Sequence, residues 1–154
     1  MGWTDELKAD KLFAEYGYFM VPFISVENMT VMSSFPSVQG TPIEPKALKA
    51  EPNTVYIAML VSDGDNLLHT MIYMPYTIEE SAAYGDVPVT WIINPAIVDL
   101  APRVFTWYEQ VMNEGGQEMG AMMGDGSPTT DRYSGFSFYC SLTRHYLRPA
   151  GMHT

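Results

Sequence analysis

The chain has 154 residues, 47% of them hydrophobic, which is enough for one domain with a hydrophobic core. Its 18 acidic and 8 basic residues give a net charge of −10, which argues against nucleic acid or an anionic membrane as a partner. The single cysteine, Cys140, excludes a disulfide within the chain. The first residues lack the pattern of a signal peptide, and no apolar run approaches the roughly 18 residues that a membrane span needs. We therefore expect a single domain over residues 1–154.

The first predicted element is a helix over about residues 4–16, which Thr4 can cap and Gly17 can end. Its apolar residues recur at helical spacing and are Ala9, Leu12, Phe13 and Tyr16. A short strand over about 18–24 is predicted next. Residues 33–53 contain four prolines and no clear period, so we expect a long loop there, with a helical turn or two within 44–51.

A near-continuous apolar run at 54–62 ends abruptly in the sequence S-D-G-D-N at 62–66. Such a run is typical of a strand that is buried on both faces of a parallel sheet. The next apolar strand is predicted at 87–93, and the interval between the run at 54–62 and this strand is long enough for a helical crossover. The two strands should therefore run parallel.

The strongest helical stripe of the chain follows Pro102 and closes at Gly115 and Gly116. Its apolar residues are Val104, Phe105, Tyr108, Val111 and Met112. A fourth strand, also short, is predicted at 118–123, and the aromatic tail over 131–147 is compatible with either helix or strand. The sequence thus predicts an α/β fold with a mostly parallel sheet and flanking helices.

Polar residues follow the end of each predicted strand. Because the carboxyl ends of parallel strands share one edge, these side chains should converge there. They include Glu27 and Asn28 after the first strand, Asp63, Asp65 and Asn66 after the second, Asn94 after the third, and Asp125 after the last.

Several ordered motifs in the chain resemble the GxGYxYP family. They are G-W-T-D-E at 2–6, Y-G at 16–17, N-M-T-V at 28–31, S-D-G-D-N at 62–66 and V-T-W-I-I-N-P-A-I-V-D-L-A-P at 89–102. The resemblance implies a glycoside hydrolase activity on carbohydrate, a TIM-like β/α barrel domain, and an exported bacterial protein. The tyrosines of the name-giving motif are absent after Gly124-Asp125-Gly126. A full barrel needs about 250 residues, so this chain resembles about half a barrel, and its open edges predict a homo-oligomer.

Glycoside cleavage requires two carboxyl groups on either side of the scissile bond. The catalytic candidates are Asp63, Asp65, Glu27 and Asp125, and the candidates for substrate binding are Asn28, Asn66, Asn94, Trp3 and Trp91. In the alternative structural interpretation, Asp65 only caps the next helix and Trp91 is buried in the core. Closely spaced Asp and Asn oxygens also suit a hard cation, but the calcium-loop spacing is absent, so we expect neither a metal nor a cofactor.

A rival function from a different class is also compatible with these residues. The chain can be a non-catalytic carbohydrate-binding or assembly module derived from such an enzyme, in which the aromatic residues and the polar rim bind but nothing is cleaved. The absent tyrosines and the short length both favour this alternative.

Overall fold

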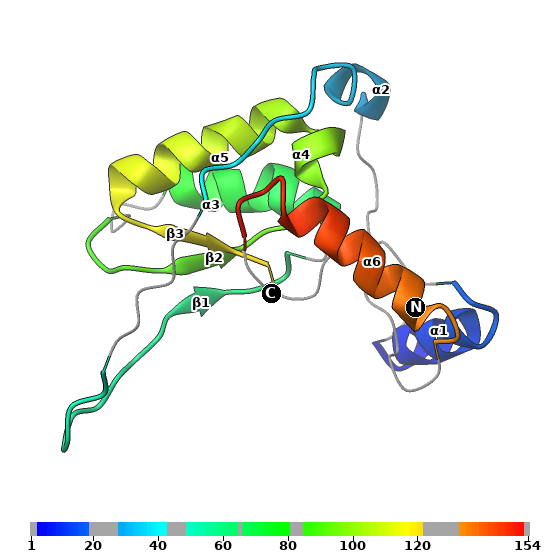
Figure 1. The fold of residues 1–154 in the computed structure, drawn as a ribbon, viewed down its shortest axis with the longest axis horizontal. Coiled ribbons are helices and arrows are strands. Elements are labelled where there is room, and N and C mark those ends of the chain that lie inside the picture. Colours follow the sequence, from blue (N-terminus) through cyan, green and yellow to red (C-terminus); the bar gives the residue numbers. More distant parts are fainter. Residues whose placement is uncertain are drawn as a thin grey trace.

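The computed structural model of the chain describes residues 3–18, 28–42, 49–64, 66–80, 85–121 and 133–152 (Figure 1). The elements in chain order are α1 (Trp3–Glu15), α2 (Met29–Met32), β1 (Leu60–Val61), the π-helical turn η1 (His69–Tyr73), α3 (Met74–Glu80), β2 (Thr90–Ile92), α4 (Ile97–Leu100), α5 (Pro102–Gly115), β3 (Glu118–Gly120) and α6 (Phe136–Leu147). The predicted strand at 18–24 lies mostly outside the described residues.

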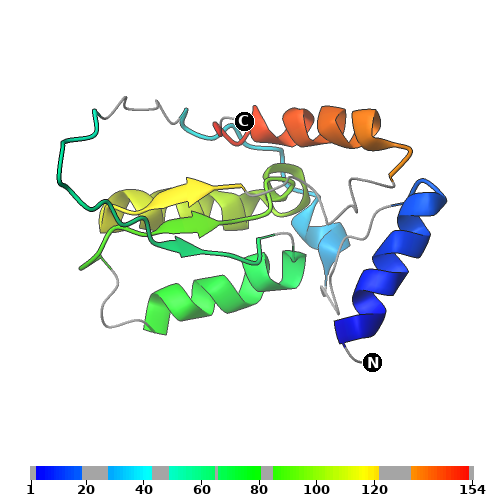
Figure 2. The same cartoon turned by 90° about the horizontal axis from the view of Figure 1, so that it is seen from below.

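The described strands form one parallel sheet in the order β1-β2-β3. Leu60 is in register with Thr90, and Thr90 with Glu118. η1 and α3 connect β1 to β2, while α4 and α5 connect β2 to β3, and α3 and α5 lie on the same side of the sheet (Figures 1 and 2). The predicted α/β class and the parallel pairing are therefore confirmed for this sheet.

The hydrophobic core lies between the sheet, the helices that cover it and the end of the chain. α5 contributes Phe105, Tyr108 and Met112, all at most 3% exposed, from the stripe predicted by the sequence. Pro102 occupies the first turn of α5, and Gly116 ends it with a φ of 62°, a left-handed conformation that favours glycine. The predicted helix boundaries are confirmed here.

Tyr108 joins α5 to the π-helical turn, because its hydroxyl donates a hydrogen bond of 2.6 Å to the backbone carbonyl of Thr70. Burial raises the pKa of Tyr108 well above its ordinary value, since the charged phenolate is poorly solvated in the core. The stability from this shift is present below the unfolded-state pKa of about 10 and is lost as the pH rises above it.

Tyr108→Phe is therefore expected to lower the free energy of unfolding by about 1–2 kcal/mol at pH 8, because it removes a buried hydrogen bond. Above pH ~10 the difference from wild type should shrink, by up to about 1.4 kcal/mol per pH unit. Urea unfolding between pH 8 and 11 measures it. Tyr76→Phe, at a tyrosine that is 64% exposed on α3, is the control and should show no comparable cost. A Tyr108→Phe cost that stays constant with pH contradicts the prediction.

The apolar run at 54–62 differs most from its prediction. Only Leu60 and Val61 form the strand, and residues 49–59 extend from the body as an arm (Figure 1). Val55 and Ile57 are 84% and 80% exposed, so the expected burial on both faces is wrong for this part of the chain. The physical reason is that β1 stands at the sheet edge, where the described residues provide it with no second neighbouring strand and no cover.

α1 confirms the predicted N-terminal helix, but its apolar stripe is not its buried face. Leu12 and Tyr16 are 55% and 74% exposed, whereas Ala14 is fully buried against Tyr133 and Tyr139. The ambiguous tail is a helix, α6, whose Tyr139 makes that contact. The contact between α1 and α6 therefore uses small and aromatic side chains in place of the predicted stripe.

The described parts of the predicted loop, 33–42 and 49–53, contain no helix or strand. Its first part lies along α5, where the Thr41 N–H donates to the Glu109 carboxylate at 2.6 Å. The Val38 N–H donates to the Val98 carbonyl at 3.3 Å, and the Gly40 N–H to the Pro149 carbonyl. This segment is therefore a packed connection that covers α4 and α5.

Candidate functional site

Asp63 lies where the sequence predicts a site, directly after β1 at the carboxyl edge of the sheet. Its side chain is exposed, and its φ of 81° is left-handed, a conformation that non-glycine residues seldom adopt. The Asp63 carbonyl accepts a hydrogen bond of 3.1 Å from the Asn66 N–H, which closes the turn. The turn thus presents the Asp63 carboxylate to solvent on a backbone that is held in place.

Gly64 packs the end of β1 directly against the end of β2. A Cβ atom at this position would lie only 2.5 Å from the carbonyl carbon of Ile92 and 2.8 Å from the nitrogen of Ile93. Only glycine permits such an approach of two backbones. The carboxyl ends of β1 and β2 are therefore adjacent, as the predicted convergence requires.

Thr70 connects the same two strand ends from the π-helical turn. It is fully buried, and its hydroxyl accepts a hydrogen bond of 3.2 Å from the Asn94 N–H and donates one of 3.4 Å to the Gly64 carbonyl. Single π-helical turns occur mostly as bulges within α-helices, frequently at functional sites. Here the turn inserts one hydroxyl between the segments that follow β1 and β2.

Trp91 belongs to β2 and Asn94 follows it, but both side chains are in the interior. Asn94 is fully buried, and its side-chain oxygen accepts a hydrogen bond of 2.9 Å from the Ala96 N–H. Trp91 is 6% exposed and belongs to the core cluster, which leaves no open ring face for a sugar. Both residues have structural roles in the described fold. The burial of Trp91 agrees with the alternative interpretation of the sequence, in which Trp91 belongs to the core.

Asn66 lies at the start of the helical segment after the turn. Its side-chain oxygen accepts a hydrogen bond of 3.1 Å from the His69 N–H, and its carbonyl accepts one of 3.0 Å from the Thr70 N–H. This is the arrangement of a helix N-cap, in which a side-chain oxygen satisfies a backbone N–H of the first turn. The side-chain oxygen of the half-buried Asn66 is therefore already used in a hydrogen bond within the protein.

Asn28 is exposed and left-handed, with a φ of 62°, and precedes α2. α2 lies on the side toward which the strands point (Figure 2). Glu27, Asp65 and Asp125 lie outside the described residues, and for Trp3 only the backbone of α1 is described. The separation between Asp63 and a second carboxylate therefore stays a prediction.

Within the described residues, no group of three or more His, Cys, Asp or Glu side chains could hold a metal ion. No described helix is long and apolar enough to cross a membrane. Of the residues in question, the structure places Asp63 at the carboxyl edge, where its carboxylate is exposed to solvent.

Thr70 and Tyr108 contribute to this edge without having been predicted by the sequence. Thr70 follows two leucines and a histidine, and no motif or period distinguishes it from other helical residues. Tyr108 is identified only as a core residue of the α5 stripe. The Tyr108 hydrogen bond depends on the distance between α5 and the π-helical turn. Those of the Thr70 hydroxyl depend on the distance between that turn and the two strand ends, and both distances are set by the tertiary structure.

A family model described as the GxGYxYP putative glycoside hydrolase C-terminal domain matches residues 53–154. This match spans more than half of the chain. The chain belongs to the GxGYxYP family. The matched region begins just before β1 and contains the whole sheet, the π-helical turn and Asp63.

The fold is also similar to that of a solved structure, described as a putative hydrolase from Bacteroides thetaiotaomicron VPI-5482. The TM-score is 0.81 at 24% sequence identity, and the match covers 97% of this chain but 30% of that chain. This likeness shows the fold alone. No curated protein matches the chain.

Proposed function

We propose that this GxGYxYP domain holds carbohydrate at the carboxyl edge of its sheet and acts as a glycoside hydrolase, with Asp63 as a catalytic or substrate-orienting carboxylate. Asp65, Glu27 and Asp125 are the candidates for the second carboxyl group. Asn28 and Asn66 are the candidates for hydrogen bonds to sugar hydroxyls. The family assignment supports the class of reaction, and the position of Asp63 supports the site.

The observation that carries this proposal is the exposed Asp63 carboxylate at the carboxyl end of a parallel strand, beside the end of the next strand. Ligands of parallel α/β folds bind at this edge, because loops from several strands meet there. The left-handed backbone at Asp63 is consistent with this role, since unusual backbone conformations cluster at functional sites.

Asp63→Asn tests the proposal with little disturbance of the backbone, because asparagine tolerates the left-handed conformation well. The full chain is assayed for release of reducing ends from a panel of oligosaccharides. Loss of an acid, base or nucleophile should lower kcat/KM at least about a hundredfold. Asp86→Asn makes the same charge change in the exposed turn before β2, at the other end of the sheet, and should leave kcat/KM unchanged. Full turnover by Asp63→Asn contradicts the proposal.

The non-catalytic binding module is the second candidate, and one observation favours it. The side-chain oxygens of Asn66 and Asn94 both accept backbone N–H groups, so less of the polar rim faces a substrate than the sequence predicts. Glycan-array binding by both wild type and Asp63→Asn, with no hydrolysis by either protein, would select this module over the enzyme.

The wider architecture is part of the proposal. We infer that the three-stranded sheet is a segment of a TIM-like barrel, since both its parallel order and its helices on one side fit that fold. The exposed edge of β1, with Val55 and Ile57 beside it, would then pair with a further strand. A second copy of the chain is one source of such a strand, and self-association stays a prediction.

A further inference from the structure

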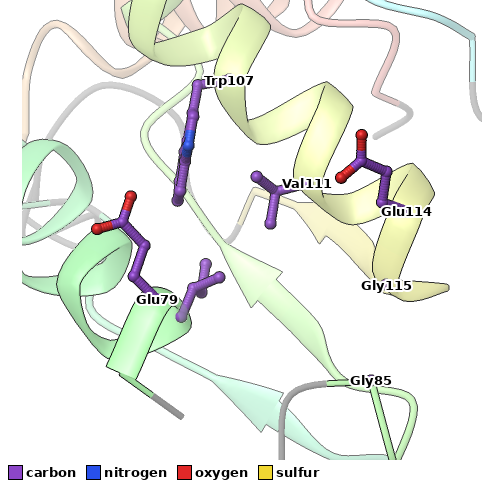
Figure 3. A pocket seen from close by; sticks show the side chains of 7 residues that line it. Glu79, Gly85, Trp107, Val111, Glu114 and Gly115 are labelled. Atoms are coloured by element: carbon purple, nitrogen blue, oxygen red, sulfur yellow. The ribbon is translucent and has the colours of Figure 1, made fainter. Parts of the chain in front are cut away.

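A hollow of about 700 Å³ lies between α3 and α5, away from Asp63 (Figure 3). Gly85 precedes β2 and Gly115 ends α5 just before β3, so the hollow is near the amino ends of these strands, whereas Asp63 is at the carboxyl edge. Its lining residues are Ile78, Glu79, Gly85, Trp107, Val111, Glu114 and Gly115. Its volume is within the range of small-molecule sites.

The indole of Trp107 forms one wall of the hollow and points from α5 toward α3 (Figure 3). The half-buried ring packs edge-to-face on Tyr108, with 5.0 Å between ring centroids and 73° between planes. Tyr108 is itself anchored by its hydrogen bond to the Thr70 carbonyl. This contact restricts the rotation of the indole before any ligand arrives, which lowers the cost of binding.

Among the described residues of the lining, the charged groups are two carboxylates, Glu79 on α3 and Glu114 on α5, and none of these residues is Lys, Arg or His. The Glu79 side chain extends beside the indole, on the facing side of the hollow (Figure 3). The Glu114 carboxylate accepts a hydrogen bond of 3.1 Å from Gln110. The apolar side chains of Ile78 on α3 and Val111 on α5 also line the hollow.

We propose that this hollow binds a small organic cation, namely an amine or guanidinium group on an aliphatic stem. Tryptophan is the ring that attracts a cation most strongly across its face, and the two carboxylates add their negative charge. Ile78 and Val111 provide apolar contact for the stem. The same lining repels anions, and it is independent of the carbohydrate chemistry proposed at Asp63.

Butylammonium, butylguanidinium and neutral 1-butanol serve as probes in an NMR titration of the Trp107 indole N–H of the full chain. Both cations should shift this resonance saturably, whereas butanol should not. Glu79→Gln should weaken cation binding about fivefold, which corresponds to the loss of one nearby charge. Glu80→Gln removes the adjacent exposed carboxylate of α3, which is not part of the lining, and should leave the affinity unchanged.

Trp107→Leu should abolish the binding of both cations. Because this variant lacks the indole, binding is monitored by the chemical shifts of the backbone amides around Val111, and circular dichroism checks that the variant is folded. Equal binding of butanol and butylammonium, or equal effects of Glu79→Gln and Glu80→Gln, would overturn the proposal. A saturable shift of Trp107 with neutral oligosaccharides but not with the cations would also overturn it. None of these results depends on hydrolysis at Asp63.

Discussion

Gly64→Ala is expected to lower the free energy of unfolding by about 3 kcal/mol or more, at the upper end of the cost of overpacking. The added methyl group would meet the Ile92 carbonyl carbon at 2.5 Å and the Ile93 nitrogen at 2.8 Å. Both are backbone atoms of the segment at the end of β2, so no side chain can rotate to make room. The substitution must separate the ends of β1 and β2, which also displaces Asp63.

Gly120→Ala in β3 is the matched control for this substitution. Its added methyl group would lie 3.1 Å from the side-chain ends of Ile92 and Thr90, which can move by small rotations. Chemical denaturation of both variants should show a much larger loss for Gly64→Ala. An equal loss of stability in the two variants would mean that the backbone segments that follow β1 and β2 are not in such close contact.

Thr70→Val is expected to lower the free energy of unfolding by about 3 kcal/mol. It leaves two buried backbone groups without a hydrogen-bond partner, and each such group costs about 1–3 kcal/mol. Those groups are the Asn94 N–H and the Gly64 carbonyl. Valine has nearly the same shape as threonine, so the loss isolates the hydrogen bonds from packing. Thermal and urea unfolding of the variant measure it.

Thr106→Val is the control, because the Thr106 hydroxyl donates to the Pro102 carbonyl at 3.0 Å on the outer side of α5. Water can replace that hydroxyl, so the expected cost is below about 1 kcal/mol. A Thr70→Val protein as stable as Thr106→Val would show that the hydroxyl does not hold the two strand ends together.

Local sequence patterns predicted those elements whose formation depends on one apolar face of a helix or on one residue that ends it. The α5 stripe and its closing Gly116 needed only helical spacing and a residue that tolerates a left-handed φ. Parallel pairing followed from the chain length between the apolar runs. The exposure of Val55 and Ile57 could not be predicted in this way, because it depends on which elements cover the run and not on the run itself.

The candidate site was predictable only in position. The turn at Asp63 follows from an apolar run that stops at polar residues, and it lies at the carboxyl edge as expected. The burial of Asn94 and the use of Asn66 as a cap depend on the π-helical turn, which places Thr70 between two strand ends. No spacing in the sequence specifies that turn, so the sequence does not distinguish these two asparagines from residues that face a ligand.

Carbohydrate binding at the edge that carries Asp63 is the property on which the proposed function rests. The most direct test is an NMR titration of the isotope-labelled full chain with an oligosaccharide identified by glycan array, with backbone amides as probes. Saturable shifts are expected at Ser62, Asp63, Gly64 and Asn66, and Asp63→Asn should weaken the binding that causes them. Shifts confined to residues at the opposite end of the sheet, with the Asp63 amide unmoved at saturation, would contradict the proposed function.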